Sequence, residues 1–408
     1  MNPSSERLVS TPFVVVTLAT GVFFIFVGMA APVLPRFVEE ELGGGGTEIG
    51  LTIAVFSLAA IAVRPLIGWL GDVAGRRALM VGGALLGGIG GGFVGLAPNM
   101  AVLLALRAVS GIGEAAVFVG SATLVADLSP PDRRAEGASY FSVAVFGGVG
   151  IGPIVGEWVL GDDRWVRVFA IGSVFCVLSA AIAMFAPGRP VTLAAGADAG
   201  TDAGAAVGGP PRRGFHSGAF GPGVVLASGI GTMAAFIAFI PTYADDLGMG
   251  GVAGVFVVYS IVNLSVRVGF ARLPERLGLA RTAAAALTAL GTGAAIAALV
   301  RSPAGLYAGT VVLALGTALL YPALLAAAVN PVPENERAQV ISTFTMFFEI
   351  GTIAGGLVLG PIVAATTERA AFVGGTVFAV TGIVLLRTWV LPRVARAELR
   401  VSKPSHSD

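Results

Sequence analysis

Charged residues are scarce in this chain. Only 12% of its 408 residues are Asp, Glu, Lys or Arg, whereas 55% are hydrophobic. Soluble domains carry about 25% charged residues, so a soluble protein of this length would lack the polar side chains to cover its surface. An exterior that faces lipid removes this shortage. The composition therefore predicts an integral membrane protein, whose partner is the bilayer.

Cysteine and histidine are also nearly absent. Cys176, the one cysteine, lies inside an apolar run, which excludes internal disulfides and cysteine-based metal clusters. The two histidines, His216 and His406, lie in polar segments, so we expect neither a catalytic histidine nor a histidine-rich metal site. We accordingly expect no enzyme, no metal and no cofactor.

Features of nucleotide and nucleic-acid binding are missing as well. The formal net charge is +1 and no basic stretch occurs, so nucleic acid is not an expected partner. No Gly-Lys-Ser/Thr of the Walker type occurs, which argues against ATP as the energy source. A glycine-rich stretch at 90–95 matches a dinucleotide fingerprint in letters only, because it lies inside an apolar run. Its glycines predict close helix packing instead.

The chain contains twelve long apolar runs. A helix of about 20 apolar residues crosses the hydrocarbon core and satisfies its own backbone groups there. The fold class expected is an all-α membrane protein with twelve transmembrane helices. The expected spans are 11–34, 49–70, 78–97, 101–126, 138–160, 165–186, 219–243, 251–270, 282–300, 304–328, 338–364 and 370–392.

A polar break separates the first six runs from the last six. Residues 187–218 are rich in Gly, Ala, Asp and Pro and have no apolar periodicity, so they predict a flexible linker. The expected organisation is a six-helix bundle over 1–186, the linker, and a second bundle over 219–408. With both termini in the cytoplasm, sixteen Arg and Lys residues fall in inside segments and five in outside segments. This bias predicts that orientation in the plasma membrane.

The two halves repeat each other at a spacing of 203 residues. Arg64 aligns with Arg267, Arg134 with Arg337, and Phe141 with Phe344. Nearby spacings align Pro35 with Pro241, each taken to close an apolar helix, and Gly152-Pro153 with Gly360-Pro361. A repeat of six helices implies a pseudo-twofold axis along the membrane normal.

Three segments resemble motifs of the major facilitator superfamily. They are Gly68-Trp-Leu70-Gly-Asp72-Val-Ala-Gly75-Arg76-Arg77, Arg107-Ala-Val-Ser-Gly111-Ile-Gly113 and Gly148-Val-Gly-Ile-Gly152-Pro153-Ile-Val-Gly156. The resemblance covers essentially the whole chain and implies a twelve-helix secondary transporter in two six-helix halves. The third segment is similar to the helix-five motif of drug and metabolite antiporters. Glu157 departs from that motif, which usually has a second glycine there.

By that resemblance, the first segment is a cytoplasmic gate. Asp72 is expected near the start of the helix over 338–364, around Ala338, where the helix dipole favours an anion. The alternative is that these charges only fix the topology. Arg64 and Arg267 either belong to the gate or extend to the membrane surface. The predicted gate residues are Arg64, Gly68, Asp72, Gly75, Arg76 and Arg77, and the helix-five motif contributes Gly148, Gly152, Pro153 and Gly156.

Four charged residues lie within predicted spans that would surround a central cavity: Arg107, Glu114, Glu157 and Glu349. Buried charges are costly in a bilayer and mark functional sites. Glu114 lies near mid-membrane, seven residues after Arg107, and is the leading candidate for proton coupling or substrate binding. Glu349 ranks second. The alternative for Glu114 is a structural hydrogen bond of a permanently protonated acid. Glu157 lies near the outer end of its helix, within reach of water.

Tyr259, Asn263 and Tyr321 are candidate hydrogen-bonding ligands of the substrate, with helix packing as the alternative. The function predicted is proton-coupled export of a small organic compound by alternating access, carried out by a monomer. Proton-coupled uptake of a small metabolite is the alternative, in which Arg107 suits an anionic substrate. A sensor that no longer transports is a further possibility. An enzyme acting on lipid would require metal or nucleophile motifs that we do not find.

Overall fold

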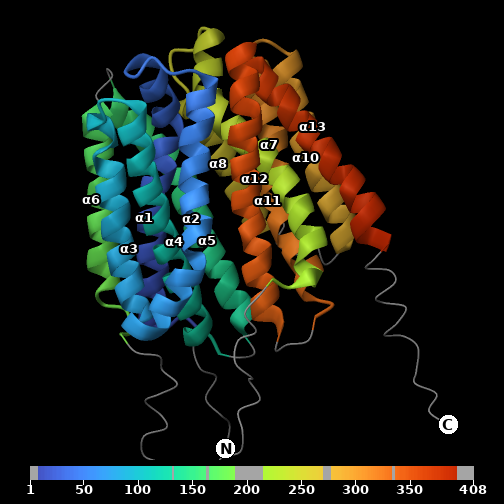
Figure 1. Ribbon diagram of the computed structural model, residues 1–408. Coiled ribbons are helices and arrows are strands. Elements are labelled where there is room, and N and C mark those ends of the chain that lie inside the picture. Colours follow the sequence, from blue (N-terminus) through green and yellow to red (C-terminus); the bar gives the residue numbers. More distant parts are fainter. Residues whose placement is uncertain are drawn as a thin grey trace, which may run out of the picture. The chain divides into compact units, whose positions relative to one another are not determined.

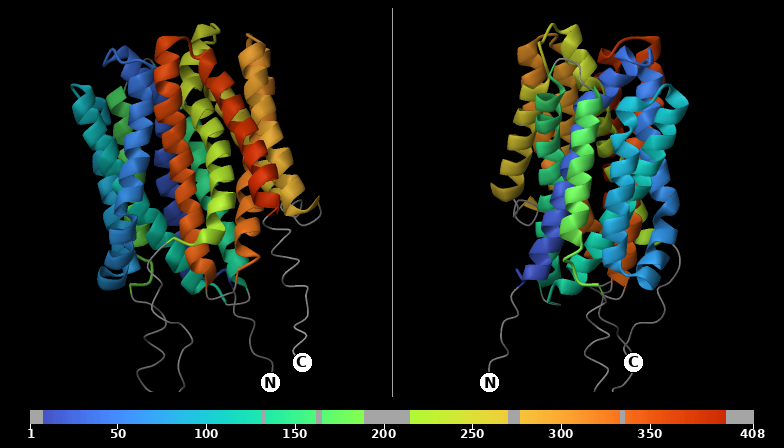
Figure 2. Two further views of the ribbon diagram at one scale, coloured as in Figure 1. Left: turned by 45° about the vertical axis from the view of Figure 1, so that its right-hand side comes forward. Right: turned by 90° about the vertical axis from the view of Figure 1, so that its left-hand side faces the viewer.

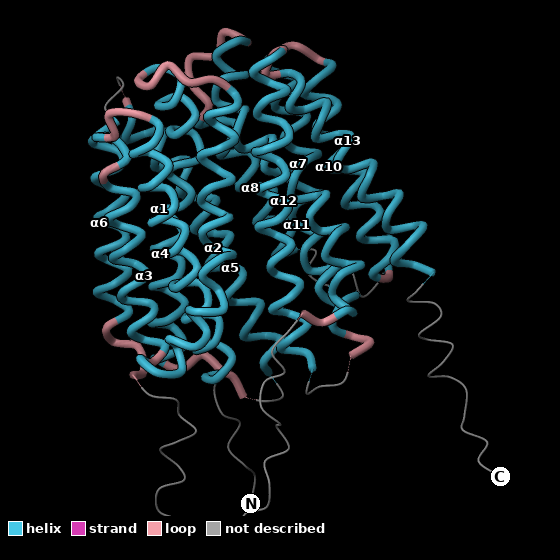
Figure 3. Tube along the Cα trace, in the orientation of Figure 1, coloured by secondary structure: helices cyan, strands magenta, loops and turns pink. Residues whose placement is uncertain are grey.

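Each apolar run forms a helix, although several helix ends differ from the expected spans. The computed structural model describes residues 8–130, 133–161, 165–188, 215–269, 277–332 and 336–392. Within these ranges it contains twelve α-helices and no strand (Figures 1 and 3). Eleven of the described helices are long and apolar enough to cross a membrane, and the twelfth, α8, is a shorter apolar helix. The expectation of an all-α, twelve-helix fold is confirmed.

The chain divides into two compact units. Unit 1 comprises Met1–Gly44, Leu51–Gly204 and Gly251–Val257. Unit 2 comprises Gly45–Gly50, Ala205–Gly250 and Val258–Asp408. The helices from α1 to α6 are α1 (Thr11–Glu40), α2 (Gly46–Ala74), α3 (Arg76–Gly92), α4 (Met100–Leu128), α5 (Arg134–Leu160) and α6 (Trp165–Ala183).

The remaining helices belong to unit 2 apart from the first turn of α8. They are α7 (Phe220–Asp246), α8 (Ala253–Gly269), α10 (Leu279–Leu299), α11 (Pro303–Val329), α12 (Arg337–Ala365) and α13 (Arg369–Leu385). A short 3-10 turn, η4 (Ser217–Ala219), precedes α7, and a π-helical turn, η6 (Leu386–Val390), follows α13. The predicted linker lies mostly outside the described residues.

Each unit is built around one central helix. In unit 1, α1 (dark blue in Figure 2) packs against α4, α5 and α6. Its Phe23, Phe24 and Phe26 lie in the buried core. In unit 2, α7 packs against α10, α11, α12 and α13, with Phe236 and Phe239 almost fully buried. These aromatic side chains fill the space between helices and fix their spacing.

Two predicted helix ends are wrong. Pro35 and Pro241 were expected to close their helices, but α1 continues to Glu40 and α7 to Asp246. A proline removes one backbone hydrogen bond, and inside a packed helical bundle the helix continues because the flanking residues remain bonded and buried. The two prolines lie five residues before their helix ends, which supports their equivalence in the repeat.

Glycine contacts reproduce the repeat atom by atom. In unit 1, a Cβ on Gly113 of α4 would overlap the backbone of Gly83 and Gly87 on α3. In unit 2, 203 residues later, a Cβ on Gly316 of α11 would overlap Ala286 and lie 2.8 Å from the Leu290 nitrogen on α10. The same residue spacing therefore produces the same helix crossing in both units.

The second proline-containing pair does not align as predicted. Gly152 of α5 meets the backbone of Ile25 on α1, and the residue in unit 2 that makes the corresponding contact is Gly355. A Cβ on Gly355 would lie 3.0 Å from the Gly231 carbonyl oxygen on α7. Gly360 lies further along α12 and faces another segment. Gly152-Pro153 and Gly360-Pro361 match in sequence but not in their contacts, because close packing depends on the glycine alone.

Candidate functional site

A seam between α2 and α4 of unit 1 holds two of the four predicted intramembrane charges, Arg107 and Glu114. Gly111 of α4 has no side chain, and a Cβ there would overlap the Phe56 backbone of α2, so the two helices approach closely. One turn earlier, the Nε–H of Arg107 donates to the Thr52 carbonyl oxygen at 3.3 Å. The Arg107 guanidinium carbon also lies 4.4 Å from the centroid of the Phe56 ring. Arg107 is thus held across the seam by a carbonyl and an aromatic face.

Arg64 enters the same seam from α2. Its neighbours on that face, Ala60 and Ile67, pack in one cluster with Ala115 of α4. The Arg64 guanidinium carbon lies 5.7 Å from the centroid of the Phe118 ring of α4. The two roles considered for Arg64, in the gate or extended to the membrane surface, both stay predictions.

Glu114 lies on α4 between these two arginine contacts. It is one helical turn before Phe118 and two turns after Arg107, about 10 Å along the helix from the latter. Its side chain is buried, with 6% of its surface exposed. An acid buried in a membrane-spanning helix is costly and marks a functional site, so Glu114 remains the leading candidate of unit 1.

The corresponding seam of unit 2 lies between α8 and α11. By the 203-residue repeat, Phe56, Arg64, Glu114 and Phe118 correspond to Tyr259, Arg267, Thr317 and Tyr321. The Nε–H of Arg267 donates to the Asn263 Oδ1 at 2.9 Å, and both tyrosines lie within electrostatic range of Arg267. The Thr317 hydroxyl donates to the Leu313 carbonyl oxygen of its own helix at 3.0 Å. The three polar residues predicted here, Tyr259, Asn263 and Tyr321, thus gather around one arginine.

Aromatic rings support the second seam. Tyr259 lies against Phe236 of α7, with ring centroids 5.9 Å apart, and Tyr321 lies against Phe344 of α12, with centroids 5.6 Å apart. Arg267 was considered only as a gate or surface residue. The repeat alignment with Arg64 was the signal that would have placed it in the seam.

Glu349, the second candidate, is buried in α12 of unit 2, with 7% of its surface exposed. Two residues later, Gly351 allows α12 to meet α7, since a Cβ there would lie 2.5 Å from the Ala227 carbonyl oxygen. Glu349 and Glu114 therefore belong to different units.

Glu157 has specific partners and does not simply reach water. It is near the end of α5, and Arg36 Nη1 of α1 lies 3.2 Å from its Oε1 and 3.4 Å from its Oε2. The backbone N–H of Val252 donates to the same Oε1 at 3.1 Å. All of these residues belong to unit 1.

The predicted gate residues are described in part. Gly75 begins α3 with a φ of 88°, a conformation that favours glycine, and so makes the sharp turn after α2. Arg76 forms an ion pair with Asp127 of α4, a partner that the sequence analysis missed. The surroundings of Gly68 and the side chains of Asp72 and Ala338 lie outside what the structure describes. The predicted contact between Asp72 and the start of α12 therefore stays a prediction.

The helix-five motif is a packing surface. Gly148, Gly152 and Gly156 follow one another at four-residue intervals, and a Cβ on each would overlap α1. Pro153 lies beside Gly28 of α1, since a Cβ on Gly28 would approach its Cδ to 3.0 Å. The sequence analysis missed Gly28, although it stands four residues before Pro32 in a glycine-containing helix.

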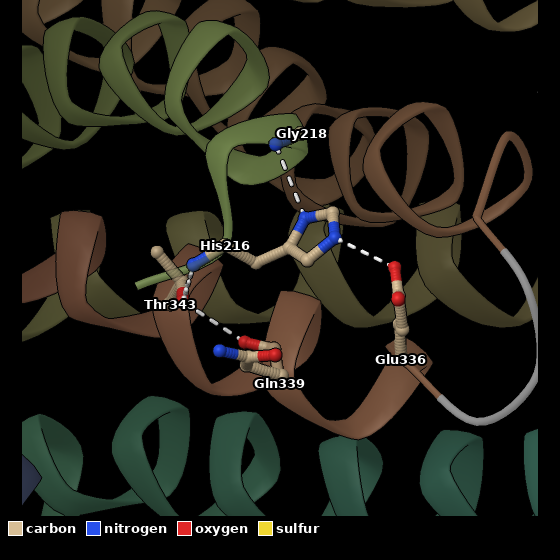
Figure 4. Close-up of polar contacts among 5 residues, drawn as sticks. All are labelled: His216, Gly218, Glu336, Gln339 and Thr343. Carbon is tan, nitrogen blue, oxygen red and sulfur yellow. Dashed lines mark hydrogen bonds and ion pairs between the residues drawn. The ribbon is translucent and has the colours of Figure 1, made fainter. Parts of the chain in front are cut away.

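A second polar cluster lies where the chain enters α7 (Figure 4). His216 accepts a hydrogen bond at Nδ1 from the Gly218 N–H at 3.1 Å, and its Nε2 lies 3.1 Å from Glu336 Oε2. Its backbone N–H donates to the Thr343 hydroxyl at 3.0 Å. This arrangement suits an imidazole with its proton on Nε2. The cluster fastens the entry of α7 to the start of α12.

No group of three or more His, Cys, Asp or Glu side chains with metal-binding geometry occurs in the described part of the chain.

Comparison with known proteins gives one family. The family model described as Major Facilitator Superfamily matches residues 16–303 and 270–406. Among curated proteins, the chain is 30% identical over 140 residues to the quinolone resistance protein NorA of Staphylococcus aureus (strain Mu50 / ATCC 700699), covering 34% of this chain and 36% of NorA. It is 29% identical over 174 residues to multidrug resistance protein 3 of Bacillus subtilis (strain 168), covering 42% of this chain and 33% of that protein. The matched stretches span about a third of these relatives.

Among solved structures, the chain is similar to a bacterial homologue of the human lysosomal transporter Spinster, in an inward-facing and unoccupied conformation. The TM-score is 0.76 at 17% sequence identity, covering 98% of this chain and 100% of that one. At this identity the likeness concerns the fold.

Proposed function

Because the chain belongs to the major facilitator superfamily, a family of membrane transporters, we propose that it exports a small organic compound in exchange for protons. Transport proceeds by alternating access, in which the cavity opens to one side of the membrane at a time. The chain has no enzymatic role in this proposal. By the excess of Arg and Lys in one set of loops, both termini lie in the cytoplasm.

The observation that carries the proposal is the position of Glu114. A carboxyl group that is 6% exposed, with an arginine contact on either side along the seam, is costly to bury unless its charge is used. When Glu114 is ionised, it offsets part of the positive charge of Arg64 and Arg107, so a cationic substrate can bind nearby. When it is protonated, the flanking arginines repel that cation. Proton binding and release of a cationic substrate are thereby coupled.

Unit 2 supplies contacts of a different kind. Its seam contains Arg267, hydrogen-bonded to Asn263, with Tyr259 and Tyr321 nearby. Phenol rings provide flat apolar surface and a hydroxyl group, which suits an aromatic compound with hydrogen-bonding substituents. We assign recognition of the uncharged part of the substrate to this seam and proton coupling to the seam of unit 1.

The names of the relatives favour export over uptake. One is a quinolone resistance protein and the other a multidrug resistance protein, and the chain resembles both over part of its length. The glycine face of α5 that meets α1 also agrees with the helix-five motif of antiporters.

Purified protein in proteoliposomes with an imposed pH gradient provides the test. Ethidium serves as a cationic aromatic probe, with one anionic and one neutral aromatic compound for comparison. We expect the pH gradient to drive ethidium transport and ethidium to drive proton movement. Glu114→Gln should abolish the pH-driven component and retain exchange of labelled for unlabelled ethidium.

Glu349→Gln is the matched control, since it removes a carboxyl buried to the same degree in unit 2. It should reduce pH-driven transport less than Glu114→Gln does. An unchanged proton dependence in Glu114→Gln would remove Glu114 from the mechanism. Accumulation of the anionic compound together with protons would instead support the uptake alternative.

A further inference from the structure

The Glu157 carboxylate joins three segments that are distant in the sequence. It lies on α5, it is paired with Arg36 of α1, and it accepts the backbone N–H of Val252, just before α8 begins at Ala253. The side chains of Arg36 and Glu157 are 11% and 12% exposed, so the pair is largely shielded from water. A shielded pair of this kind is much less screened than one at the surface.

The start of α8 is chemically suited to a carboxylate. The first backbone N–H groups of a helix lack partners within the helix, and they carry the positive end of its dipole. Val252 is the residue whose carbonyl accepts the first bonds of α8, from the N–H groups of Val255 and Phe256. Glu157 therefore caps α8 with a side chain from another helix.

Gly251 makes this approach possible. Its φ is 153°, a conformation that side chains disfavour, and a Cβ there would lie only 3.2 Å from Glu157 Oε1. A glycine immediately before the capped residue lets the loop come within hydrogen-bonding distance of the carboxylate.

We propose that Glu157 is a positioning residue for transport: its carboxylate clamps the first turn of α8 to α1 and α5, and this clamp opens during each cycle. The proposal rests on the alternating-access function proposed above. The first turn of α8 belongs to unit 1, whereas its continuation from Val258 belongs to unit 2. Because α8 is shared in this way, a movement of unit 2 relative to unit 1 acts directly on the bond between Val252 and Glu157.

Glu41 offers a matched control in the same unit. Its carboxylate accepts the indole N–H of Trp165 at 2.8 Å and thereby ties the end of α1 to the start of α6. Like Glu157, it is an acid that links helices, but α8 does not contribute to this bond. Glu41→Ala therefore reports what the loss of a comparable carboxylate link does without opening the clamp.

Hydrogen–deuterium exchange of the full chain in nanodiscs tests the clamp without any transport. In Glu157→Ala we expect the amides of residues 252–256 to exchange at least about 10-fold faster than in the wild type, because the cap of α8 is lost. Glu41→Ala should leave the exchange of these amides unchanged. Equal exchange in Glu157→Ala and the wild type would overturn the proposal.

A charge swap separates the clamp from a simple tie between α1 and α5. The double variant Arg36→Glu/Glu157→Arg restores an ion pair between those helices but places a cation against the N-terminus of α8. We expect exchange at 252–256 to remain fast and ethidium transport to remain at least about five-fold below the wild type. Recovery of slow exchange in the double variant would show that Glu157 only ties α1 to α5.

Addition of ethidium tests whether the clamp opens in the cycle. In the wild type, the probe should speed exchange at 252–256, and in Glu157→Ala it should have no further effect. Slow exchange in the wild type whether or not ethidium is present, in protein that transports ethidium, would overturn the opening step. If the wild type transports none of the probes, the proposed function fails, while the effect of Glu157→Ala on exchange still decides the clamp.

Discussion

The two seams of this transporter share a scaffold and differ in chemistry. In each unit a glycine packs the second helix of the seam against a further helix, Gly113 of α4 against α3 and Gly316 of α11 against α10. In each seam an arginine lies near aromatic rings. In unit 1 the residue after the packing glycine is Glu114, flanked by phenylalanines. In unit 2 it is Thr317, flanked by tyrosines. The repeat kept the contacts that set the helix crossing and changed the groups that carry charge and hydrogen bonds.

This difference is the basis of the proposed assignment of proton coupling to unit 1 and substrate recognition to unit 2. A buried carboxyl group can gain or lose a proton, whereas threonine and tyrosine stay neutral near pH 7. A proton site is therefore possible in the unit 1 seam and absent from the described residues of the unit 2 seam. Hydroxyl groups, by contrast, both donate and accept hydrogen bonds, which suits recognition of a neutral group.

The largest expected effect comes from the shared scaffold. Gly113→Val and Gly316→Val each force a side chain into the backbone of the adjacent helix, because a Cβ alone already overlaps it. Each should destabilise the fold by at least about 3 kcal/mol, as overpacking of a tight contact does. Thermal unfolding in detergent and the yield of monodisperse protein measure this. A tolerated variant in only one unit would show that the two crossings are not equivalent.

The next largest effect concerns Glu114, the acid of the unit 1 seam that Thr317 replaces in unit 2. Glu114→Thr should lower pH-driven ethidium transport about 100-fold, the order expected when a proton-transfer group is removed. The double variant Glu114→Thr/Thr317→Glu should regain part of the proton coupling, because Arg267 in the second seam corresponds to Arg64 in the first. Proton movement in proteoliposomes reports the result. No recovery would mean that surroundings outside the seams determine the coupling.

A smaller effect distinguishes the two arginines. Arg267→Lys loses the hydrogen bond to Asn263 and should cost about 2 kcal/mol of stability, as for a hydrogen bond to a charged group. Arg64→Lys keeps a cation near the Phe118 ring and should cost about 0.5 kcal/mol. Melting temperatures of the two variants give the comparison. A larger loss in Arg64→Lys would indicate that Arg64 has stronger partners than this ring.

The smallest effect compares the entries of the two central helices. Ser10 caps α1 by accepting the Phe13 N–H, and His216 occupies the corresponding place before α7, at the spacing that relates Pro35 to Pro241. Ser10→Ala and His216→Ala should each cost about 1 kcal/mol, the usual value of such a cap. His216→Asn should retain the bond to Gly218 and lose only the contact with Glu336. Thermal unfolding distinguishes these cases, and equal losses in the Ala and Asn variants would assign the effect to Glu336.

Several site residues were predictable because burial of a charge in an apolar run is visible in the sequence. Glu114 and Glu349 were selected on that basis, and both are buried. Partners were not predictable. Asp127 pairs with Arg76, and Arg36 pairs with Glu157, across 51 and 121 residues of sequence respectively. No local pattern links such residues, since the bond depends on how two helices cross.

The number of helices, the repeat and the family could be read from the sequence, because a hydrocarbon solvent demands long apolar helices and duplication leaves a constant spacing. The contacts of each glycine, the grouping of Asn263 and two tyrosines near Arg267, and the capping of α8 by Glu157 became visible only in the folded chain. Apolar length is a property of each segment taken alone. The partners of a buried side chain depend on the rotation and crossing of several helices at once, and composition carries no record of these.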